Sequence, residues 1–565
     1  MKKLLNRYIS ACILVTLLGT ASCTKNFGDI NTNPSVVSKP DVKFLLSYSE
    51  DKIITYQGTE WVWESMEQLM RFTQHVTSSP YEITNNVNTR YNIYYLQILP
   101  NLFEIRRQVD LMPDPDKAQY QKIKMVTYVL QALHGIKVTD MNGSMPYSQA
   151  IDGRYEGKYS PVYDEQQPLF DTWLTELDDA IKVLADNSLT NQVGYGQADI
   201  FYQSDWTKWV KLANTLKLRI AARLENADKA KCQAIFQQVM QDATGPIDED
   251  AAQVKYMNST YSPFGNSTDI DYRSRRYATT SIMKFLKGSN DPRLPVYFEK
   301  NDLIGSYKDT LTKYNVTLPA FINPVDPLIM YQGGPADWTT NPTVAFYIGN
   351  NFVASPYTKY NLISAINRKF FSPKLNQATG NFLDVPVTYA ETCFYIAEFI
   401  QKGYAGAVNT KGTAQEWYNK GIASSIQTMN AIAIAAGSTT AFSGTGETEI
   451  SNYQNNALVK FNGTNDLERI YIQQYLGLYR QPNEAYVFCR RTGYPKNSSV
   501  YYAREPFNEL IPRRFWLTDP GEVNRANWTT AQQQQGFTLN AQDLPTLSSQ
   551  RIWYDKTAPD FGKGN

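Results

Sequence analysis

Two stretches of apolar residues spaced three or four positions apart constrain the fold of this chain more than any other feature. The first begins near Asp164, a candidate N-cap with Gln167 three residues later, and the second begins at Asp205. This spacing predicts amphipathic helices that each bury one face, with Trp206 and Trp209 in the core. The apolar positions are Leu169, Phe170, Trp173, Leu174, Leu177, Ile181 and Leu184 in the first stretch, and Trp206, Trp209, Val210, Ala213, Leu216, Ile220 and Leu224 in the second.

Helical periodicity extends over 41–242 and returns at 387–403, 413–429 and 466–480. A short Gly-containing turn separates 387–403 from 413–429, which predicts a helical hairpin of the tetratricopeptide type. No exact self-similarity of about 34 residues supports a regular repeat, however. We therefore predict an all-α fold built from helix pairs, with few short strands.

Residues 243–384 differ from the helical regions, because they are rich in Asn, Ser, Thr, Tyr, Pro and Gly. Only 279–286 is predicted to be helical there. A long irregular stretch inside a helical protein usually carries function. We therefore interpret 41–565 as a single domain, in which 41–242 and 385–490 form the scaffold and 243–384 form the ligand-face loops.

The first 40 residues have the pattern of an export signal followed by a tether. A basic start precedes an apolar run at 8–18, which is too short for a span of about 20 apolar residues. Small residues follow, and then Cys23. This order predicts a signal peptide at 1–22, lipidation of Cys23 and a polar tether at 23–40, so that acyl chains anchor the protein to a membrane. The alternative is ordinary cleavage after Ala21 or Ser22, which would leave the chain unanchored.

Composition narrows the classes of function. A formal net charge of +1 gives no reason to expect nucleic acid as a partner. The 39 Tyr and 10 Trp against only 2 His favour recognition by aromatic faces over metal or histidine chemistry. We expect Cys232, Cys393 and Cys489 to be small buried hydrophobes, with one disulfide among them as the alternative. No cofactor is predicted.

Motifs of nucleophilic, zinc or phosphate chemistry are missing from the sequence: it contains no HExxH, GxSxG, P-loop or CxxC pattern. We interpret His75 and His134 as structural. A glycosidase stays open, because it needs only two carboxylates placed in space.

Three stretches in the expected non-helical regions combine aromatic rings with amides and charged groups, as sugar recognition requires. They are 81–95, 256–277 and 331–341. The alternative is that these aromatic residues anchor long loops to the core. The candidate ligand-binding residues are Tyr81, Asn85, Asn88, Arg90 and Tyr91, then Tyr261, Phe264, Asp271, Tyr272 and Arg275, and finally Tyr331, Gln332, Asp337 and Trp338.

Short phrases along almost the whole chain, in a constant order, carry a resemblance to a known family. They include FGDINTNP at 27–34, a loop at 140–150 that ends MPYSQA, WTKWVKLANTLKLRIAAR at 206–223 and DPRL at 291–294. Later phrases lie at 389–391, 397–398, 484–486, 490–495, 511–514 and 553–555. The chain resembles the SusD/RagB family of nutrient-binding outer-membrane lipoproteins of Bacteroidetes, and in particular its second sequence subgroup.

The resemblance implies a SusD-like fold and a non-enzymatic protein that captures an oligosaccharide or related nutrient at the cell surface. It also implies a partner, a SusC-like TonB-dependent transporter on which the protein sits as a lid. The phrases at 490–495 and 140–150 are expected to tie helices together, with anion binding by the arginines as the alternative. The family's sugar-binding positions do not align with 255–345. Two other functions stay open: a surface-anchored glycan hydrolase, and a helical-repeat scaffold that binds only protein.

Overall fold

The computed structural model describes residues 41–54, 59–78, 87–258, 276–372 and 380–564. The expected signal peptide, Cys23 and the tether therefore lie outside the described residues. No helix of the described part is both long and apolar enough to cross a membrane.

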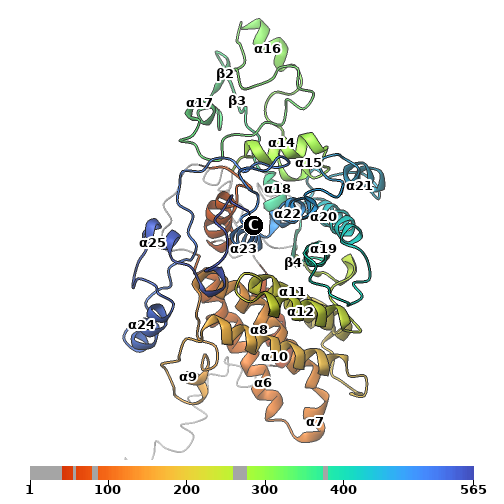
Figure 1. Cartoon of the computed structure of the whole chain (residues 1–565), viewed down its shortest axis with the longest axis vertical. Helices are drawn as coiled ribbons and strands as arrows, with labels where there is room; N and C mark the ends of the chain where they lie inside the picture. The colour runs from red at the N-terminus through yellow and green to blue at the C-terminus, as the bar shows by residue number, and fades with distance from the viewer. Residues whose placement is uncertain (1–40, 55–58, 79–86, 259–275, 373–379, 565) are drawn as a thin grey trace, which may run out of the picture.

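Packed helices from the N-terminal half form one end of the molecule (Figure 1). Long apolar faces explain these helices: Trp173, Leu177 and Trp209 are all buried. The helices are α3 (Val42–Ile53), α6 (Leu99–Asp110), α7 (Asp114–Gln119), α8 (Gln121–Asn142), α9 (Asp152–Tyr155), α10 (Gln166–Ala185), α11 (Trp206–Leu224) and α12 (Lys229–Gln241).

A second group of helices packs above the first and carries the predicted hairpin, in which α19 contacts α20. Two short strands lie beside it, β1 (Val254–Asn258) and β4 (Phe382–Val387), which pair antiparallel with Val254 opposite Val387. The helices are α18 (Arg368–Phe371), α19 (Tyr389–Gln401), α20 (Ala414–Ala436), α21 (Glu447–Gln454), α22 (Asp466–Gly477) and α23 (Pro482–Thr492).

Shorter elements connect and cover these two groups. The N-terminal ones are η1 (Thr59–Leu69), α4 (Met70–Phe72), α5 (Thr89–Ile93) and η2 (Tyr94–Ile98). Single turns lie at η3 (Gly196–Ala198), η4 (Asp250–Ala252) and η6 (Leu478–Arg480). The C-terminal segment wraps along one side of the body with α24 (Arg525–Gln534), α25 (Leu544–Ser549) and η7 (Trp553–Asp555) (Figure 1).

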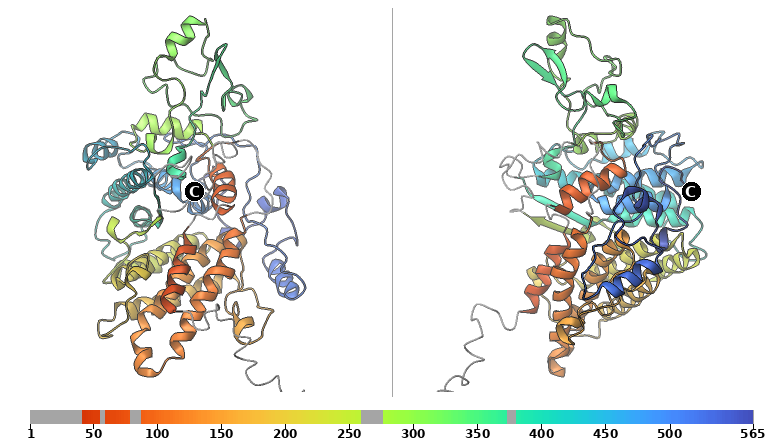
Figure 2. Two further views of the ribbon diagram at one scale, coloured as in Figure 1. Left: turned by 180° about the vertical axis from the view of Figure 1, so that it is seen from behind. Right: turned by 90° about the vertical axis from the view of Figure 1, so that its left-hand side faces the viewer.

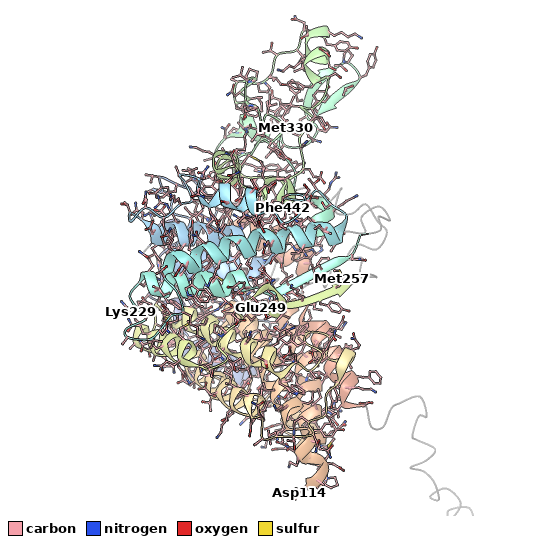
Figure 3. All side chains as sticks on the ribbon, turned by 90° about the vertical axis from the view of Figure 1, so that its right-hand side faces the viewer. Asp114, Lys229, Glu249, Met257, Met330 and Phe442 are labelled. Carbon is pink, nitrogen blue, oxygen red and sulfur yellow. The ribbon has the colours of Figure 1, made fainter. Side chains whose placement is uncertain are left out.

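Residues 299–366 project from the opposite end and are called the protruding unit here (Figures 1 and 2). Its base rests on α14 (Thr280–Ser289) and α15 (Leu294–Tyr297). The unit contains α16 (Tyr307–Lys313), α17 (Pro342–Ala345) and the hairpin of β2 (Phe352–Ser355) and β3 (Thr358–Tyr360). Figure 3 shows Met330 in this unit and Asp114 at the far end of the body.

Buried arginines tie the body together at the phrases that carry the family resemblance. Arg223 contacts Asp140 at 2.9 Å and Glu484 at 2.7 Å, so it joins α11 to α8 and α23. Arg491 pairs with Glu225 at 2.6 Å and also with Glu398. The structural interpretation of 490–495 and 140–150 is therefore confirmed for these pairs, because the arginines are buried and already hold carboxylates.

Several local predictions about helices were wrong. Residues 243–384, where the sequence predicts a helix only at 279–286, also contain the short helices α15, α16, α17 and α18. Asp164 is not the N-cap of α10, which begins at Gln166. Its carboxylate instead accepts the backbone N–H groups of Tyr147 and Ser148, each at 2.9 Å, because residues 145 and 164 pair as a bridge. Trp206 opens α11 and is only partly buried, since the first turn of a helix has fewer neighbours. Asp205 does cap α11, and Cys232, Cys393 and Cys489 are free and buried, as expected.

Candidate glycan-binding junction

The end of the second predicted stretch and part of the third meet Thr77, which precedes the first stretch, where the protruding unit joins the body. Thr77, just before the first stretch, pairs with Tyr277, the last residue of the second: each backbone N–H donates to the other's carbonyl, at 2.8 and 3.0 Å. Trp338, in the third stretch, donates its indole N–H to Thr77 Oγ1 at 3.0 Å. We call this place the junction and define it by Thr77, Tyr277, residues 335–341 and residues 505–509.

The third stretch is fastened by carboxylates that accept backbone N–H groups. Asp337 accepts the N–H of Thr339 and that of Asn508, both at 2.8 Å. Burial by itself would raise the pKa of Asp337, but these hydrogen bonds outweigh it and lower the pKa below its usual value. Glu505 accepts the N–H groups of Ser281 at 2.9 Å and Ala336 at 3.0 Å. The loop carrying Trp338 is therefore preorganised.

Aromatic and amide side chains face solvent at the junction. Trp338 and Phe507 are partly exposed, while Asn341 and Asn508 are exposed. Buried Arg71 lies 5.9 Å from the centre of the Phe507 ring and pairs with Glu509. Rings that keep an accessible face, beside amides that can donate and accept, are the groups that bind the apolar face and the hydroxyls of a sugar.

The carboxylates at the junction are all engaged in holding the loops. Asp337 and Glu505 accept backbone N–H groups on both oxygens, and Glu509 pairs with Arg71. A glycosidase needs one carboxyl group free to donate a proton and a second free to attack or to activate water. Using any of these carboxylates in that way would break a contact that shapes the loop, so the junction is suited to binding.

The other predicted ligand residues that the structure describes take mainly structural positions. Arg90 is fully buried, pairs with Glu64 at 3.3 Å and donates to Asn483. Asn88 is buried and donates to the Trp516 carbonyl at 2.8 Å. Tyr91 packs 4.5 Å from the Tyr95 ring on α5 and η2, so this part of the first stretch is helical, contrary to prediction.

In the third stretch, Tyr331 is buried in the main core and its carbonyl accepts from Lys287. Gln332 is half-buried and bonds through its backbone to Ser364. Asp337 shapes the loop, and among the predicted residues of this stretch Trp338 is the one whose ring is partly exposed at the junction. The remaining predicted residues lie outside the described part of the chain: Tyr81, Asn85, Tyr261, Phe264, Asp271, Tyr272 and Arg275.

Phe507 and Asn508 were missed by sequence reasoning. The available signal was an aromatic residue beside an asparagine in the Pro- and Asn-containing C-terminal segment. That signal recurs throughout this chain, so it does not single out Phe507.

Both histidines are buried in the body. Burial lowers the pKa of His75 and that of His134 to about 3, which keeps both rings neutral. Each ring faces a carbonyl, that of Tyr475 at 2.8 Å and that of Arg90 at 3.1 Å. Among the described residues, no group of three His, Cys, Asp or Glu side chains could hold a metal ion.

A fold of helix pairs carrying a preorganised aromatic and amide surface defines a class of binding proteins. A family model described as "Starch-binding associating with outer membrane" matches residues 34–517. The chain belongs to this SusD-like family, and the predicted resemblance and all-α fold are confirmed. The family's description is that of an outer-membrane-associated binding protein and not of an enzyme.

Solved structures with this fold include a chitin-binding protein, with a TM-score of 0.68 and 20% identity over 91% of this chain and 100% of that one. A chitin-binding SusD homolog from Flavobacterium johnsoniae has a TM-score of 0.63 at 19% identity, over 92% and 99% of the two chains. A SusD homolog from Bacteroides fragilis has a TM-score of 0.67 at 16% identity, over 91% and 100%. No curated protein matches the chain in sequence.

Proposed function

We propose that this protein captures a neutral oligosaccharide at the junction and delivers it to a SusC-like TonB-dependent transporter, over which it acts as a lid. The observation that carries the proposal is the preorganised loop of Trp338, which leaves this ring partly exposed beside the exposed Asn508 amide while the carboxylates around it are engaged. The mechanism is capture and release, with no bond made or broken.

Membrane anchoring through acylated Cys23 is part of the same proposal. Its support is the order of basic, apolar and small residues before Cys23, together with a family described as associated with the outer membrane. A lid held beside a transporter would trap ligand between two partners, so weak binding by each alone would suffice.

Isothermal titration calorimetry tests the capture step. The full-length protein in detergent is titrated with maltotetraose and chitotetraose, because the family and two solved relatives are described by starch and chitin. We expect saturable heat with one of these probes. Trp338→Ala should weaken binding about thirtyfold, since an aromatic hot spot contributes about 2 kcal/mol.

Tyr159→Ala is the matched control, because this ring is 70% exposed and follows α9 at the far end of the body. Equal affinities of wild type, Trp338→Ala and Phe507→Ala would refute binding at the junction. New reducing ends during the titration would identify a hydrolase instead. If neither glycan produces binding heat and a protein partner co-purifies with the chain, the scaffold function would be favoured.

Delivery is tested separately from capture. Co-expression with a SusC-like TonB-dependent transporter should yield a complex that survives detergent extraction, and a Cys23→Ser variant should lose membrane attachment. A chain that stays on the membrane without Cys23 would contradict the lipid anchor.

A further inference from the structure

A cavity lies between the start of α10, the end of α24 and η7. Here the loop at 140–150 meets the phrase at 553–555. None of the residues that line the cavity belongs to the junction. The cavity has a volume of about 80 Å³. It is lined by Ser144, Glu165, Gln166, Gln167, Gln534, Gln535, Trp553 and Lys556.

Buried amides hold the walls of this cavity in place. Gln166 is 1% exposed, donates to the Thr139 carbonyl at 3.0 Å and accepts the backbone N–H of Trp553 at 2.9 Å. Gln535 accepts the N–H of Ser144 at 2.8 Å and donates to the Ala531 carbonyl at 3.0 Å. These contacts position Trp553 and the Gln535 amide before any ligand arrives.

Gly143 is required for this arrangement. Its φ of +81° favours glycine, and a side chain there would overlap the Gln535 amide oxygen. The loop at 140–150 therefore does more than join α8 to α10, because it also gives Gln535 its place in the cavity wall.

Four lining side chains remain available for a ligand. Glu165, Gln167, Gln534 and Lys556 are exposed, and none has a hydrogen bond or ion pair to another described residue. The first turn of α10 also lacks a side-chain cap. Trp553 is partly exposed and supplies an aromatic wall.

The balance of charge points to a neutral ligand, because the single carboxylate of Glu165 offsets the single ammonium of Lys556. The amides of Gln167 and Gln534, with the charged groups of Lys556 and Glu165, can donate to and accept from the hydroxyls of a sugar. The Trp553 ring can pack against its apolar face. We infer that this cavity is a second glycan site, which takes one neutral sugar residue against Trp553 and binds its hydroxyls through Gln167, Gln534 and Lys556.

This inference shares the ligand class of the proposed function but not its residues. Two sites on one protein would hold a long polymer at two points, which raises the apparent affinity for long chains over short ones. Glycan binding at the junction does not require binding at the cavity, and binding at the cavity does not require binding at the junction.

Calorimetry on the full-length protein with maltotetraose and chitotetraose tests the second site. We expect wild type to bind two equivalents of one probe, and Trp338→Ala to retain the equivalent held at the cavity. Gln534→Ala combined with Lys556→Ala should weaken that equivalent about tenfold, since each lost hydrogen bond costs a few-fold in affinity. Both side chains are exposed, so the fold should survive.

Gln533→Ala is the matched control, because Gln533 is the preceding exposed residue on α24 and does not line the cavity. The inference is overturned if Gln534→Ala/Lys556→Ala binds both probes as Gln533→Ala does. A single equivalent that Trp338→Ala abolishes would overturn the cavity site and leave the junction intact. The reverse result would support the cavity and refute the junction, and no binding of any probe would refute both.

Tetragalacturonate tests the assignment to neutral sugars. We expect no heat that depends on Gln534 or Lys556 with this acidic probe. Tighter binding of tetragalacturonate than of the neutral probes, lost in the Lys556→Ala variant, would overturn the assignment.

Discussion

The helical body and the protruding unit differ in the interactions that stabilise each of them. In the body, Arg219, Arg223 and Arg491 are buried, and each bridges helices that are far apart in sequence. The unit instead has its own small apolar cluster around Leu303, Tyr307 and Phe352. Its base is joined to the body by main-chain hydrogen bonds, such as Ala278 N–H to the Ser364 carbonyl and Gly334 N–H to the Ala278 carbonyl. The Lys287–Asp326 ion pair and the packing of Tyr331 in the main core add side-chain contacts to this attachment.

The difference between main-chain hydrogen bonds and buried ion pairs indicates where the protein tolerates substitutions. A main-chain hydrogen bond can be made by almost any residue, so this part of the unit's attachment tolerates changes of side chain. A buried ion pair cannot lose one partner without stranding the other charge. The family phrases accordingly lie mostly in the body, whereas the predicted ligand stretch 331–341 lies in the unit.

The largest effect is expected from Arg223→Met. Burial by itself would raise the pKa of Glu484, but Arg219 and Arg223 outweigh it and lower the pKa. Removing Arg223 leaves the Asp140 and Glu484 carboxylates short of a partner, which should cost about 3–5 kcal/mol of the free energy of unfolding. Urea denaturation followed by circular dichroism measures this loss. A change below about 1 kcal/mol would show that the pairs do not hold the body together.

A core truncation in the protruding unit should have a smaller and local effect. Leu303 is 1% exposed in the unit's own cluster, so Leu303→Ala should destabilise the unit by about 3 kcal/mol. Hydrogen exchange should then speed up within 299–366 while the helices of the body keep their protection. Equal loss of protection in α19 and α20 would show that unit and body unfold together.

Acid should destabilise the body through its histidines. The pKa of His75 is about 3 in the folded state because burial disfavours the cation, whereas an unfolded histidine has a pKa of about 6.5. The unfolded chain therefore binds more protons below about pH 6.5, and stability falls as the pH decreases from there toward 3. Each histidine contributes up to about 1.4 kcal/mol per pH unit.

The His75→Gln variant separates this contribution from those of the carboxylates. Glutamine can still donate to the Tyr475 carbonyl but does not titrate. Denaturation at several pH values should show a shallower loss of stability between pH 6 and 4 in the variant. His134 is unchanged and serves as the internal reference, and an unaltered slope would mean that His75 does not sense acid.

The smallest effect is expected from an exposed ion pair of the body. Lys231 contacts Asp171, and their side chains are 32% and 49% exposed. Lys231→Ala should change the free energy of unfolding by less than about 1 kcal/mol, and less still in high salt. A loss comparable to that of Arg223→Met would contradict the view that burial makes the arginine pairs decisive.

The helices were predictable because their information is local. The spacing of Leu177 and Trp209 with their apolar neighbours requires a buried face, and both residues are buried. Asp205 caps its helix as expected because an N-cap bonds only two or three residues ahead. Asp164 did not, because its carboxylate accepts the N–H groups of Tyr147 and Ser148 in a loop that pairs with it, and that pairing is not visible in the local sequence.

The junction was predictable only in part. Sequence marked 331–341 as rich in recognition chemistry, but it could not separate Trp338, which stays partly exposed, from Tyr331, which is buried. Phe507 arrives from a segment about 170 residues further along the chain, where no local pattern distinguishes it. The cavity at Trp553 is likewise lined by residues from distant parts of the chain, which the sequence analysis treated as separate parts of the scaffold.

By itself the sequence determined the helical class, the family and the body's helices, because periodicity and short phrases encode contacts between near neighbours. Tertiary structure decided which arginines are buried against which carboxylates, which aromatic rings stay partly exposed, and which side chains come together at the junction and at the cavity. The physical reason is that exposure and charge pairing depend on what packs against a side chain. In this protein those neighbours come from hundreds of residues away, as with Arg223 and Glu484.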